Sequence, residues 1–252
     1  MARPRFRLPA ALLAALAASG SSAAGAAGAQ PVAILAYHHI GVAPHGTARP
    51  LLWVRPALLR RQLAALDRAG YAAVTLQRAW RAWHGGEMLP THAVVLSFDD
   101  GYSSQARIAG PALRAHRWPG VLNLQVARLG APGGLTRAQV RRLIRAGWEI
   151  DAHSVTHPDL TRVSAQRLDA EVAGSRRAIR RSFGVPADFF AYPYGREDAR
   201  VRAAVRRAGF LGATTIHAGF ASPRTDPFAL GRVLVPAGRS PAALLQMLRS
   251  GG

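Results

Sequence analysis

The sequence predicts an α/β fold built on a parallel sheet of about seven or eight strands. After residue 30, short apolar runs alternate with amphipathic, arginine-rich segments, and this alternation is typical of repeated βα units. Polar clusters follow three of the apolar runs, as expected where the carboxyl ends of parallel strands form a site. The pattern fits either a (β/α) barrel or an open doubly wound sheet. No G-x-G-x-x-G motif follows the first strand, which disfavours a dinucleotide-binding sheet.

Each strand is predicted from a short apolar run, and each helix from apolar residues that recur at three- and four-residue spacing. The predicted strands are Val32–Tyr37, Ala72–Leu76, Ala93–Phe98, Gly120–Val126, Trp148–Ala152, Asp188–Tyr192, Phe210–Ile216 and Arg232–Val235. The predicted helices are Pro56–Ala69, a short stretch through Trp83, Ser104–His116 with an interruption at Gly110-Pro111, Thr136–Ala146, Ser164–Phe183, Glu197–Ala208 and a last helix capped by Ser240. No internal repeat or linker interrupts this order, so we expect a single domain.

The composition excludes several kinds of chemistry. All 33 basic residues are arginine, because the chain has no lysine, so lysine Schiff-base chemistry and a P-loop lysine are excluded. The absence of cysteine excludes disulfides, cysteine-bound zinc, iron–sulfur clusters and a cysteine nucleophile. The net charge of +20 favours anionic partners, but the arginines are scattered along predicted helices and no nucleic-acid-binding motif is present. We therefore expect a solvated basic surface, no nucleic-acid partner and at most a weak attraction to anionic envelope polymers.

The first 29 residues have the pattern of a secretory signal peptide. Arg3, Arg5 and Arg7 precede a short apolar run, and Ala27-Gly28-Ala29 offers a cleavage site. An uncleaved membrane anchor is the alternative, although the run is short for a bilayer span. The expected mature domain, residues 30–252, would then act in the periplasm or outside the cell without stable membrane insertion.

The polar clusters contain residues suited to metal binding and acid–base chemistry. His153 and His157 are four residues apart, so in a helical turn their imidazoles would face one side and could share a metal. Asp99 or Asp100 could complete a His-His-Asp set with open positions for water and substrate. Neighbouring side chains on a strand alternate in direction, so one aspartate could bind metal while the other acts as a base. Ordinary loop hydrogen bonding or a simple Asp-Gly turn are the alternatives for these residues.

Taken together, the clusters resemble the motifs of the polysaccharide deacetylases (carbohydrate esterase family four). Three segments match in order and spacing, and the chain's opening is similar to the Y-H-x-[IV] start of members that act on poly-N-acetylglucosamine. They are Ser97-Phe98-Asp99-Asp100-Gly101 for T-F-D-D-G, His153-Ser154-Val155-Thr156-His157 for H-[ST]-x-x-H, Phe190-Ala191-Tyr192-Pro193-Tyr194-Gly195 for F-R-P-P-Y-G, and Leu35-Ala36-Tyr37-His38-His39-Ile40 for the opening.

The resemblance implies a distorted (β/α) barrel, commonly seven-stranded, and a role for each matching residue. Asp99 would be the general base, and Asp100, His153 and His157 would bind a divalent cation, typically zinc. The backbone N–H of Tyr194 would help to hold the oxyanion. His38, at the end of the first strand, and Tyr192 would line the substrate site.

The chain departs from the family pattern at several positions. Ala191 stands where many members have an arginine that orients the base. The late L-x-x-H motif, whose histidine acts as the general acid in the family, is absent. His217, the only histidine after His157, is a candidate for that acid, with an ordinary surface histidine as the alternative. We expect Asp226 and Arg232 to serve in an ion pair or a turn cap. Trp53 is the best-placed tryptophan for stacking on a sugar.

The resemblance implies a metal-dependent N-deacetylase acting on an acetylated polysaccharide, poly-N-acetylglucosamine or a similar polymer. Two other functions stay open at this stage. One is an O-acetyl esterase acting on a glycan such as xylan with the same residues. The other is a catalytically silent glycan-binding relative, which the departures would suggest but the intact aspartates and histidines argue against.

Overall fold

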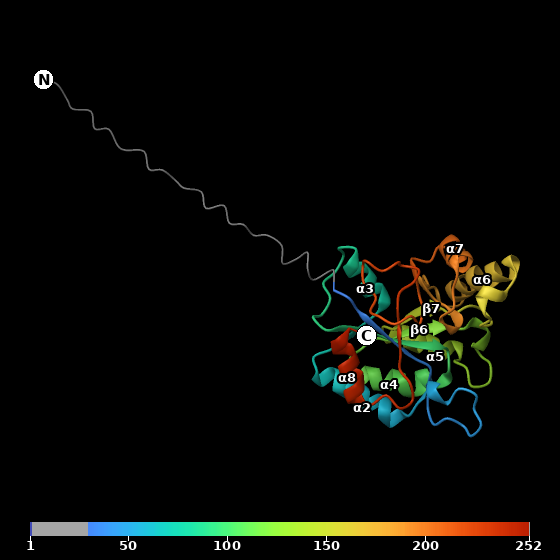
Figure 1. Ribbon diagram of the computed structural model, residues 1–252, viewed down its shortest axis with the longest axis horizontal. Helices are drawn as coiled ribbons and strands as arrows, with labels where there is room; N and C mark the ends of the chain where they lie inside the picture. The colour runs from blue at the N-terminus through green and yellow to red at the C-terminus, as the bar shows by residue number, and fades with distance from the viewer. Residues whose placement is uncertain (2–29, 252) are drawn as a thin grey trace.

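The computed structural model describes Met1 and residues 30–251 and contains a curled sheet of parallel strands with helices around it (Figure 1). Residues 2–29, which hold most of the expected signal peptide, lie outside the described residues. The main sheet comprises β1 (Ala33–Tyr37), β4 (Ala72–Val74), β5 (Ala93–Asp100), β6 (Val121–Leu124), β7 (Glu149–Ala152), β8 (Phe189–Ala191), β9 (Gly212–Thr214) and β10 (Val233–Leu234). A separate two-stranded sheet pairs β2 (His39–Ile40) with β3 (Trp53–Val54).

The sheet curls into a barrel, as the resemblance predicts. Seven strands follow one another in the order β10-β1-β5-β6-β7-β8-β9, and all their pairings are parallel. The eighth, β4, pairs with the first half of β5 at Ala93–Val95, while β6 pairs with the second half. A parallel bridge joins Thr214 at the end of β9 to Leu230, which leads into β10. The seven parallel strands in one curled sheet confirm the predicted distorted (β/α) architecture.

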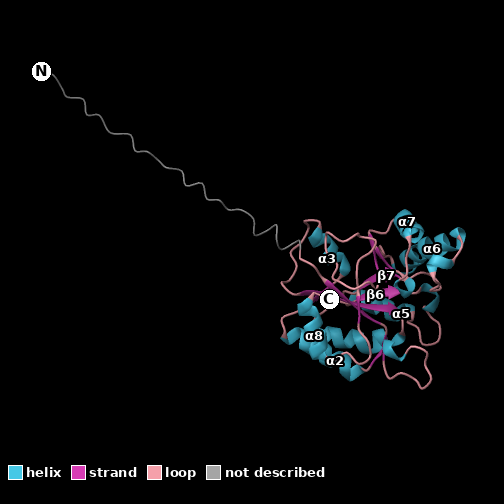
Figure 2. Cartoon of the chain, in the orientation of Figure 1, coloured by secondary structure: helices cyan, strands magenta, loops and turns pink. Residues whose placement is uncertain are grey.

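The helices pack on the outside of the sheet (Figure 2). They are α2 (Pro56–Arg68), α3 (Leu76–Trp83), α4 (Gly110–Ala115), α5 (Arg137–Arg145), α6 (Ala165–Phe183), α7 (Ala199–Arg207) and α8 (Pro241–Ser250). The predicted caps Thr136, Ser164 and Ser240 each accept a hydrogen bond from the backbone N–H three residues later. The predicted helix Ser104–His116 is a π-helix over Gln105–Ala109 followed by α4, because Pro111 cannot donate an intrahelical hydrogen bond.

Two apolar clusters fill the two sides of the sheet. One cluster, which includes Leu96, Ile150 and Phe190, packs between the strands and the outer helices. The other, which includes Ile34 and Val95, fills the lower part of the barrel interior. Toward the carboxyl ends of the strands the interior becomes polar, and this is where the sequence places its candidate site.

Among the helices of residues 30–251, none is both long and apolar enough to cross a bilayer.

Candidate metal centre and active site

The parallel register places polar side chains of three neighbouring strands at one level of the barrel interior. Asp99 of β5 is aligned with Asn123 of β6, and Asn123 with Asp151 of β7. Residues in register on parallel strands face the same side of a sheet, so these three form a row across the interior. β5 continues two residues beyond its predicted end, which brings Asp99 and Asp100 into the sheet itself.

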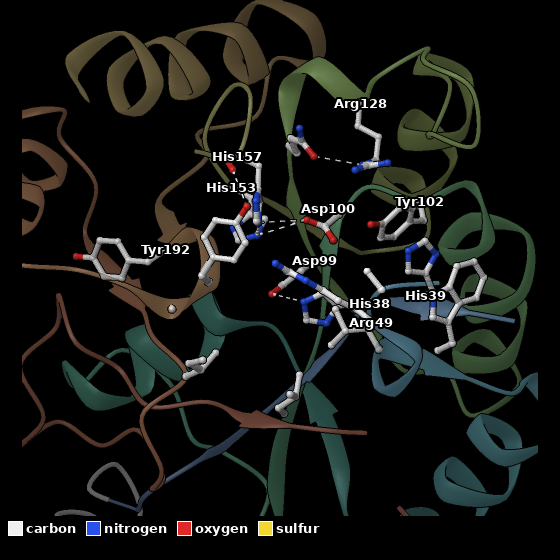
Figure 3. A pocket seen from close by; sticks show the side chains of 18 of the residues that line it. His38, His39, Arg49, Asp99, Asp100, Tyr102, Arg128, His153, His157 and Tyr192 are labelled. Atoms are coloured by element: carbon white, nitrogen blue, oxygen red, sulfur yellow. Dashed lines mark hydrogen bonds and ion pairs between the residues drawn. The ribbon is translucent and has the colours of Figure 1, made fainter. Parts of the chain in front are cut away.

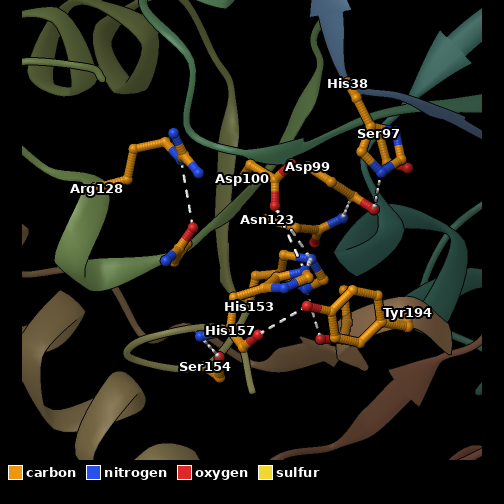
Figure 4. Close-up of polar contacts among 12 residues, drawn as sticks. His38, Ser97, Asp99, Asp100, Asn123, Arg128, His153, Ser154, His157 and Tyr194 are labelled. Carbon is orange, nitrogen blue, oxygen red and sulfur yellow. Dashed lines mark hydrogen bonds and ion pairs between the residues drawn. The ribbon is translucent and has the colours of Figure 1, made fainter. Parts of the chain in front are cut away.

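Three side chains converge at the mouth of the barrel in the arrangement of a metal centre. Potential ligand atoms of Asp100, His153 and His157 all lie within 4.8 Å of one another. Asp100 Oδ1 is 3.6 Å from His153 Nε2 and 3.5 Å from His157 Nε2, and the two Nε2 atoms are 3.1 Å apart (Figure 4). The structure therefore brings together the three residues expected to bind metal.

The chemistry of these donors fits a cation. His153 Nδ1 lies 2.7 Å from the carbonyl oxygen of Ala191, so Nδ1 carries the proton and the Nε2 lone pair is free to coordinate. Burial lowers the pKa of His157 to about 4, which keeps this imidazole in the neutral form that binds metal. Two imidazole nitrogens and one carboxylate oxygen form a set typical of zinc and related divalent metals.

The loop after β7 holds both histidines, although it is not the helical turn that the spacing suggested. Ser154 and His157 instead adopt left-handed conformations, with φ of 60° and 64°, which are costly for residues other than glycine. Glu171 of α6 stabilises this shape because its carboxylate accepts hydrogen bonds from the backbone N–H groups of Val155 and Thr156 at 2.8 and 2.7 Å. Such local strain at a ligand loop is common where function fixes the geometry.

Asp99 lies outside the metal set and has its own partners. Arg232 Nη1 donates to Asp99 Oδ1 at 2.7 Å, and Asn123 Nδ2 donates to the same oxygen at 2.7 Å. Burial alone would raise the pKa of Asp99, but the positive charge of Arg232, with smaller effects of His153 and His38, brings the pKa below its ordinary value. Asp99 is therefore an ionised carboxylate in a buried place.

Arg232 is the functional residue that sequence reasoning missed. It forms an ion pair as expected, but its partner is Asp99 of the site, 133 residues away, and the guanidinium is almost fully buried. Its guanidinium holds the Asp99 carboxylate at 2.7 Å, whereas Ala191, at the position of the family's arginine, has no group that could do so. Asp226 also forms ion pairs, with Arg202 and Arg206, away from the site.

Both histidines at the end of β1 line the site cavity. His38 is the one that the resemblance implies, and His39 can line the cavity as well because β1 ends at Tyr37, so the two side chains need not alternate as on a strand. His38 Nε2 lies 3.7 Å from Asp99 Oδ2, and burial lowers the pKa of His38. His39 is stacked between Trp53 and Tyr102, with centroid distances of 3.7 and 3.3 Å. Trp53 therefore lines the cavity, with one side of its ring covered by His39.

The third motif contributes one ring at the mouth of the site and one in the core. Tyr194 has a left-handed conformation, with φ of 59°, and its ring packs edge-on against His157 at 4.6 Å. The Tyr192 side chain is buried and points away from the metal ligands (Figure 3), and its hydroxyl donates to the carbonyl oxygen of Phe228 at 3.0 Å. Tyr192 is among the residues that line the cavity, although its hydroxyl is already hydrogen-bonded to the backbone of Phe228.

His217 is not brought to the site. It lies exposed in the loop after β9 and is absent from the residues that line the cavity. That cavity has a volume of about 630 Å³ and includes the metal centre, Asp99, His38 and several aromatic and arginine side chains.

Comparisons with known proteins agree with this geometry. The polysaccharide deacetylase family profile matches residues 87–213. YxkH of Bacillus subtilis (strain 168) is 26% identical over 174 residues, covering 69% of this chain and 62% of YxkH. The poly-beta-1,6-N-acetyl-D-glucosamine N-deacetylase of Escherichia coli (strain K12) is 46% identical over 68 residues, covering 27% of this chain and 10% of that protein. The chain thus spans less than two thirds of the length of these curated relatives.

Solved structures give the same fold. The Streptococcus pyogenes deacetylase PplD, in complex with acetate, superposes with a TM-score of 0.82 at 27% identity, covering 87% of this chain and 99% of that one. IcaB from Ammonifex degensii superposes with a TM-score of 0.76 at 22% identity, covering 87% and 97%. With a family profile matched over half of its length and the motif residues gathered in one cavity, this chain belongs to the polysaccharide deacetylase family.

Proposed function

We propose that this protein is a metal-dependent hydrolase that removes acetyl groups from N-acetylhexosamine units of a polysaccharide outside the cytoplasm. Poly-N-acetylglucosamine or a similar polymer is the proposed substrate. One observation carries the proposal. Asp100, His153 and His157 converge on one point, while Asp99, the next residue to a ligand, is kept out of that set by Arg232 and stays ionised. The two aspartates therefore have separate roles.

Asp100, His153 and His157 would hold a divalent cation, with zinc as the first choice for this donor set. When bound, the cation would polarise the acetamide carbonyl and lower the pKa of water. Its three protein ligands would come from the last residue of β5 and from the loop after β7, and a three-ligand set of this kind would leave positions for water and substrate.

The chain's own residues would manage the protons. Asp99 would accept the proton of the attacking water, and Arg232 and Asn123 hold its carboxylate in one orientation while it does so. Asp99 would pass the proton taken from water to His38, whose Nε2 lies 3.7 Å away in the cavity lining, and His38 would give it to the leaving amine. The backbone N–H of Tyr194 remains our proposed donor to the oxyanion, a contact typically worth about 3–4 kcal/mol in the transition state.

The location of the enzyme is also part of the proposal. Residues 1–29 are proposed as a cleaved signal peptide and residues 30–252 as the catalytic domain that acts in the periplasm or outside the cell. Similarity to an enzyme named for poly-beta-1,6-N-acetyl-D-glucosamine supports an exported polymer as the substrate.

Metal content tests the centre and histidine variants test the acid. We expect about one divalent ion per chain, and His153→Ala should lose tight binding. His38→Ala should keep the metal and lose turnover by about 10²–10⁴, whereas the matched His217→Ala should keep both. Unchanged metal in His153→Ala would disprove the ligand set. Loss of turnover in His217→Ala, with His38→Ala unaffected, would return the acid role to His217.

Product release from a panel of glycans tests the reaction. The panel contains β-1,4- and β-1,6-linked N-acetylglucosamine oligomers and acetylated xylan. Amine formation from the N-acetylated oligomers supports the proposal. Acetate from xylan alone would make the protein an O-acetyl esterase, and metal binding without any product would make it a silent glycan-binding relative.

A further inference from the structure

Two arginines at the site cavity have no part in the proposed reaction. The charged side chains that line the cavity are Asp99, Asp100, Arg49, Arg128 and Arg232. Arg232 is paired with Asp99, and Asp100 belongs to the metal set. Arg49 and Arg128 therefore add two positive charges to a cavity in which Asp99 already has an arginine partner and Asp100 is assigned to the metal.

Neither guanidinium is neutralised by the protein. Within residues 30–251, the ion pairs of the structure engage neither Arg49 nor Arg128. Arg128 Nε donates to the Gln125 side-chain oxygen at 3.3 Å (Figure 3), which leaves its terminal nitrogens free for another partner. Arg128 is half-buried and Arg49 is exposed, so both can reach a ligand without leaving the cavity wall.

Aromatic rings hold each guanidinium in place. Arg49 lies over the ring of Tyr194 at 5.0 Å, and Arg128 over the ring of Tyr102 at 4.3 Å. A guanidinium that stacks by its face keeps its N–H edge free for hydrogen bonds, and this planar fork matches the two oxygens of a carboxylate or phosphate. The stacking thus prepares both donors before a ligand arrives.

The same rings connect the arginines to the metal centre. Tyr194 packs against His157 at 4.6 Å, and Tyr102 lies two residues after Asp100 and lines the same cavity. A single tyrosine ring therefore separates Arg49 from His157, and another separates Arg128 from the segment that carries Asp100. An anion bound there would lie on a sugar next to the one whose acetyl group is removed.

A neutral N-acetylglucosamine chain can accept hydrogen bonds from these donors but has no anionic group to balance their two charges, and its deacetylated product is an ammonium that they would repel. We infer that Arg49 and Arg128 form an anion subsite, and that the preferred substrate is an acidic N-acetylated glycan. In such a glycan a carboxylate or phosphate would flank the N-acetylhexosamine unit. This inference rests on the proposed deacetylase function. Within the acetylated polysaccharides it favours an acidic polymer over neutral poly-N-acetylglucosamine.

The experiment compares three oligosaccharide series of equal length. One is neutral N-acetylglucosamine, one alternates N-acetylglucosamine with glucuronic acid, and one alternates N-acetylglucosamine with a phosphate-bearing sugar. Amine formation gives kcat/KM for the metal-loaded enzyme at low and high salt. We expect at least one acidic series to exceed the neutral one by about tenfold or more at low salt, and the preference to shrink as salt rises. The two acidic series distinguish a carboxylate from a phosphate.

Matched double variants assign the effect to these arginines. Arg49→Gln/Arg128→Gln should reduce the preference to about one. Arg180→Gln/Arg181→Gln removes the same charge from exposed residues of α6 that line a separate arginine-rich groove, and it should keep the preference.

Three outcomes would overturn a claim. Equal kcat/KM for neutral and acidic series in the wild type would overturn the inference and leave the deacetylase function standing. A preference that survives Arg49→Gln/Arg128→Gln would overturn the assignment to these residues. Amine formation from none of the three series would instead contradict the deacetylase function on which the inference rests.

Discussion

Asp99 and Asp151 occupy the same level of the barrel interior and have opposite electrostatic behaviour. Each is 1% exposed, and Asn123 lies between them in the register of the sheet. Arg232 lowers the pKa of Asp99 despite its burial. Burial and the neighbouring carboxyl of Glu149 raise the pKa of Asp151 well above its ordinary value. The partner rather than the depth of burial thus decides whether a buried carboxyl is charged.

The two aspartates should respond very differently to the same substitution. Asp99→Asn should lower the turnover rate by about 10²–10⁴, because the general base is lost, while metal content stays the same. Asp151→Asn is the matched control at the same level of the barrel. Its side-chain oxygen can still accept the hydrogen bond from Phe189 N–H, so turnover should change only a few-fold. Deacetylation rates and metal analysis of both proteins measure this difference, and equal losses would show that the level matters rather than the partner.

Removing the arginine should turn Asp99 into an unpaired buried charge. Arg232→Met is expected to lower the free energy of unfolding by about 3–5 kcal/mol, the usual cost of breaking a buried ion pair, and to lower turnover as well. Adding Asp99→Asn to this variant should recover most of the stability but none of the activity. Urea unfolding of the two single variants and the double variant measures the coupling. Additive losses of stability would mean that the pair contributes little.

Asn123 should hold the carboxylate of Asp99 in position, and it should matter less for Asp151. Its amide donates to Asp99 Oδ1 at 2.7 Å, and a hydrogen bond to a charged group is worth about 1.5–3 kcal/mol. Asn123→Ala should therefore reduce turnover tens-fold while metal content stays unchanged. Asn123→Ser, which can still donate a hydrogen bond, should lose less. Identical rates for the two variants would argue against a positioning role.

The pair of Glu149 and Asp151 should give the smallest effect, visible in the pH dependence of stability. Burial raises the pKa of Glu149 in the folded protein, so the pair keeps a proton that the unfolded chain releases above about pH 4.5. Its contribution to stability is complete below that pH and is lost as pH rises toward the folded pKa, by up to about 1.4 kcal/mol per pH unit for each retained proton.

Glu149→Gln removes one of the two ionisable groups and keeps the polar contact. Urea unfolding from pH 4 to 8 should show the variant gaining stability relative to the wild type as pH rises. Any pH dependence of metal binding is shared by both proteins and cancels in the difference. Parallel curves would mean that the pair ionises normally.

Much of the fold and the metal set could be predicted from sequence because both depend on local patterns. Strand and helix periodicities are local, and Asp100, His153 and His157 each follow a strand whose end the parallel topology fixes at one edge. The side chains that hold the Asp99 carboxylate could not be predicted in this way. Arg232 is one of 33 basic residues, and nothing local marks it as the partner of a residue 133 positions away. The position of His217 likewise depended on a loop path that periodicity does not specify.

The ion pair between Asp99 and Arg232 also has a consequence for how the chain folds. Arg232 immediately precedes β10, which pairs with β1, and Leu230 bridges to β9, so the pair can form only when the two ends of the sheet meet. Contacts so distant in sequence are entropically costly to close and form slowly. We therefore expect the reactive carboxylate to gain its counter-charge at the end of folding. Stopped-flow refolding should accordingly show secondary structure returning before catalytic competence.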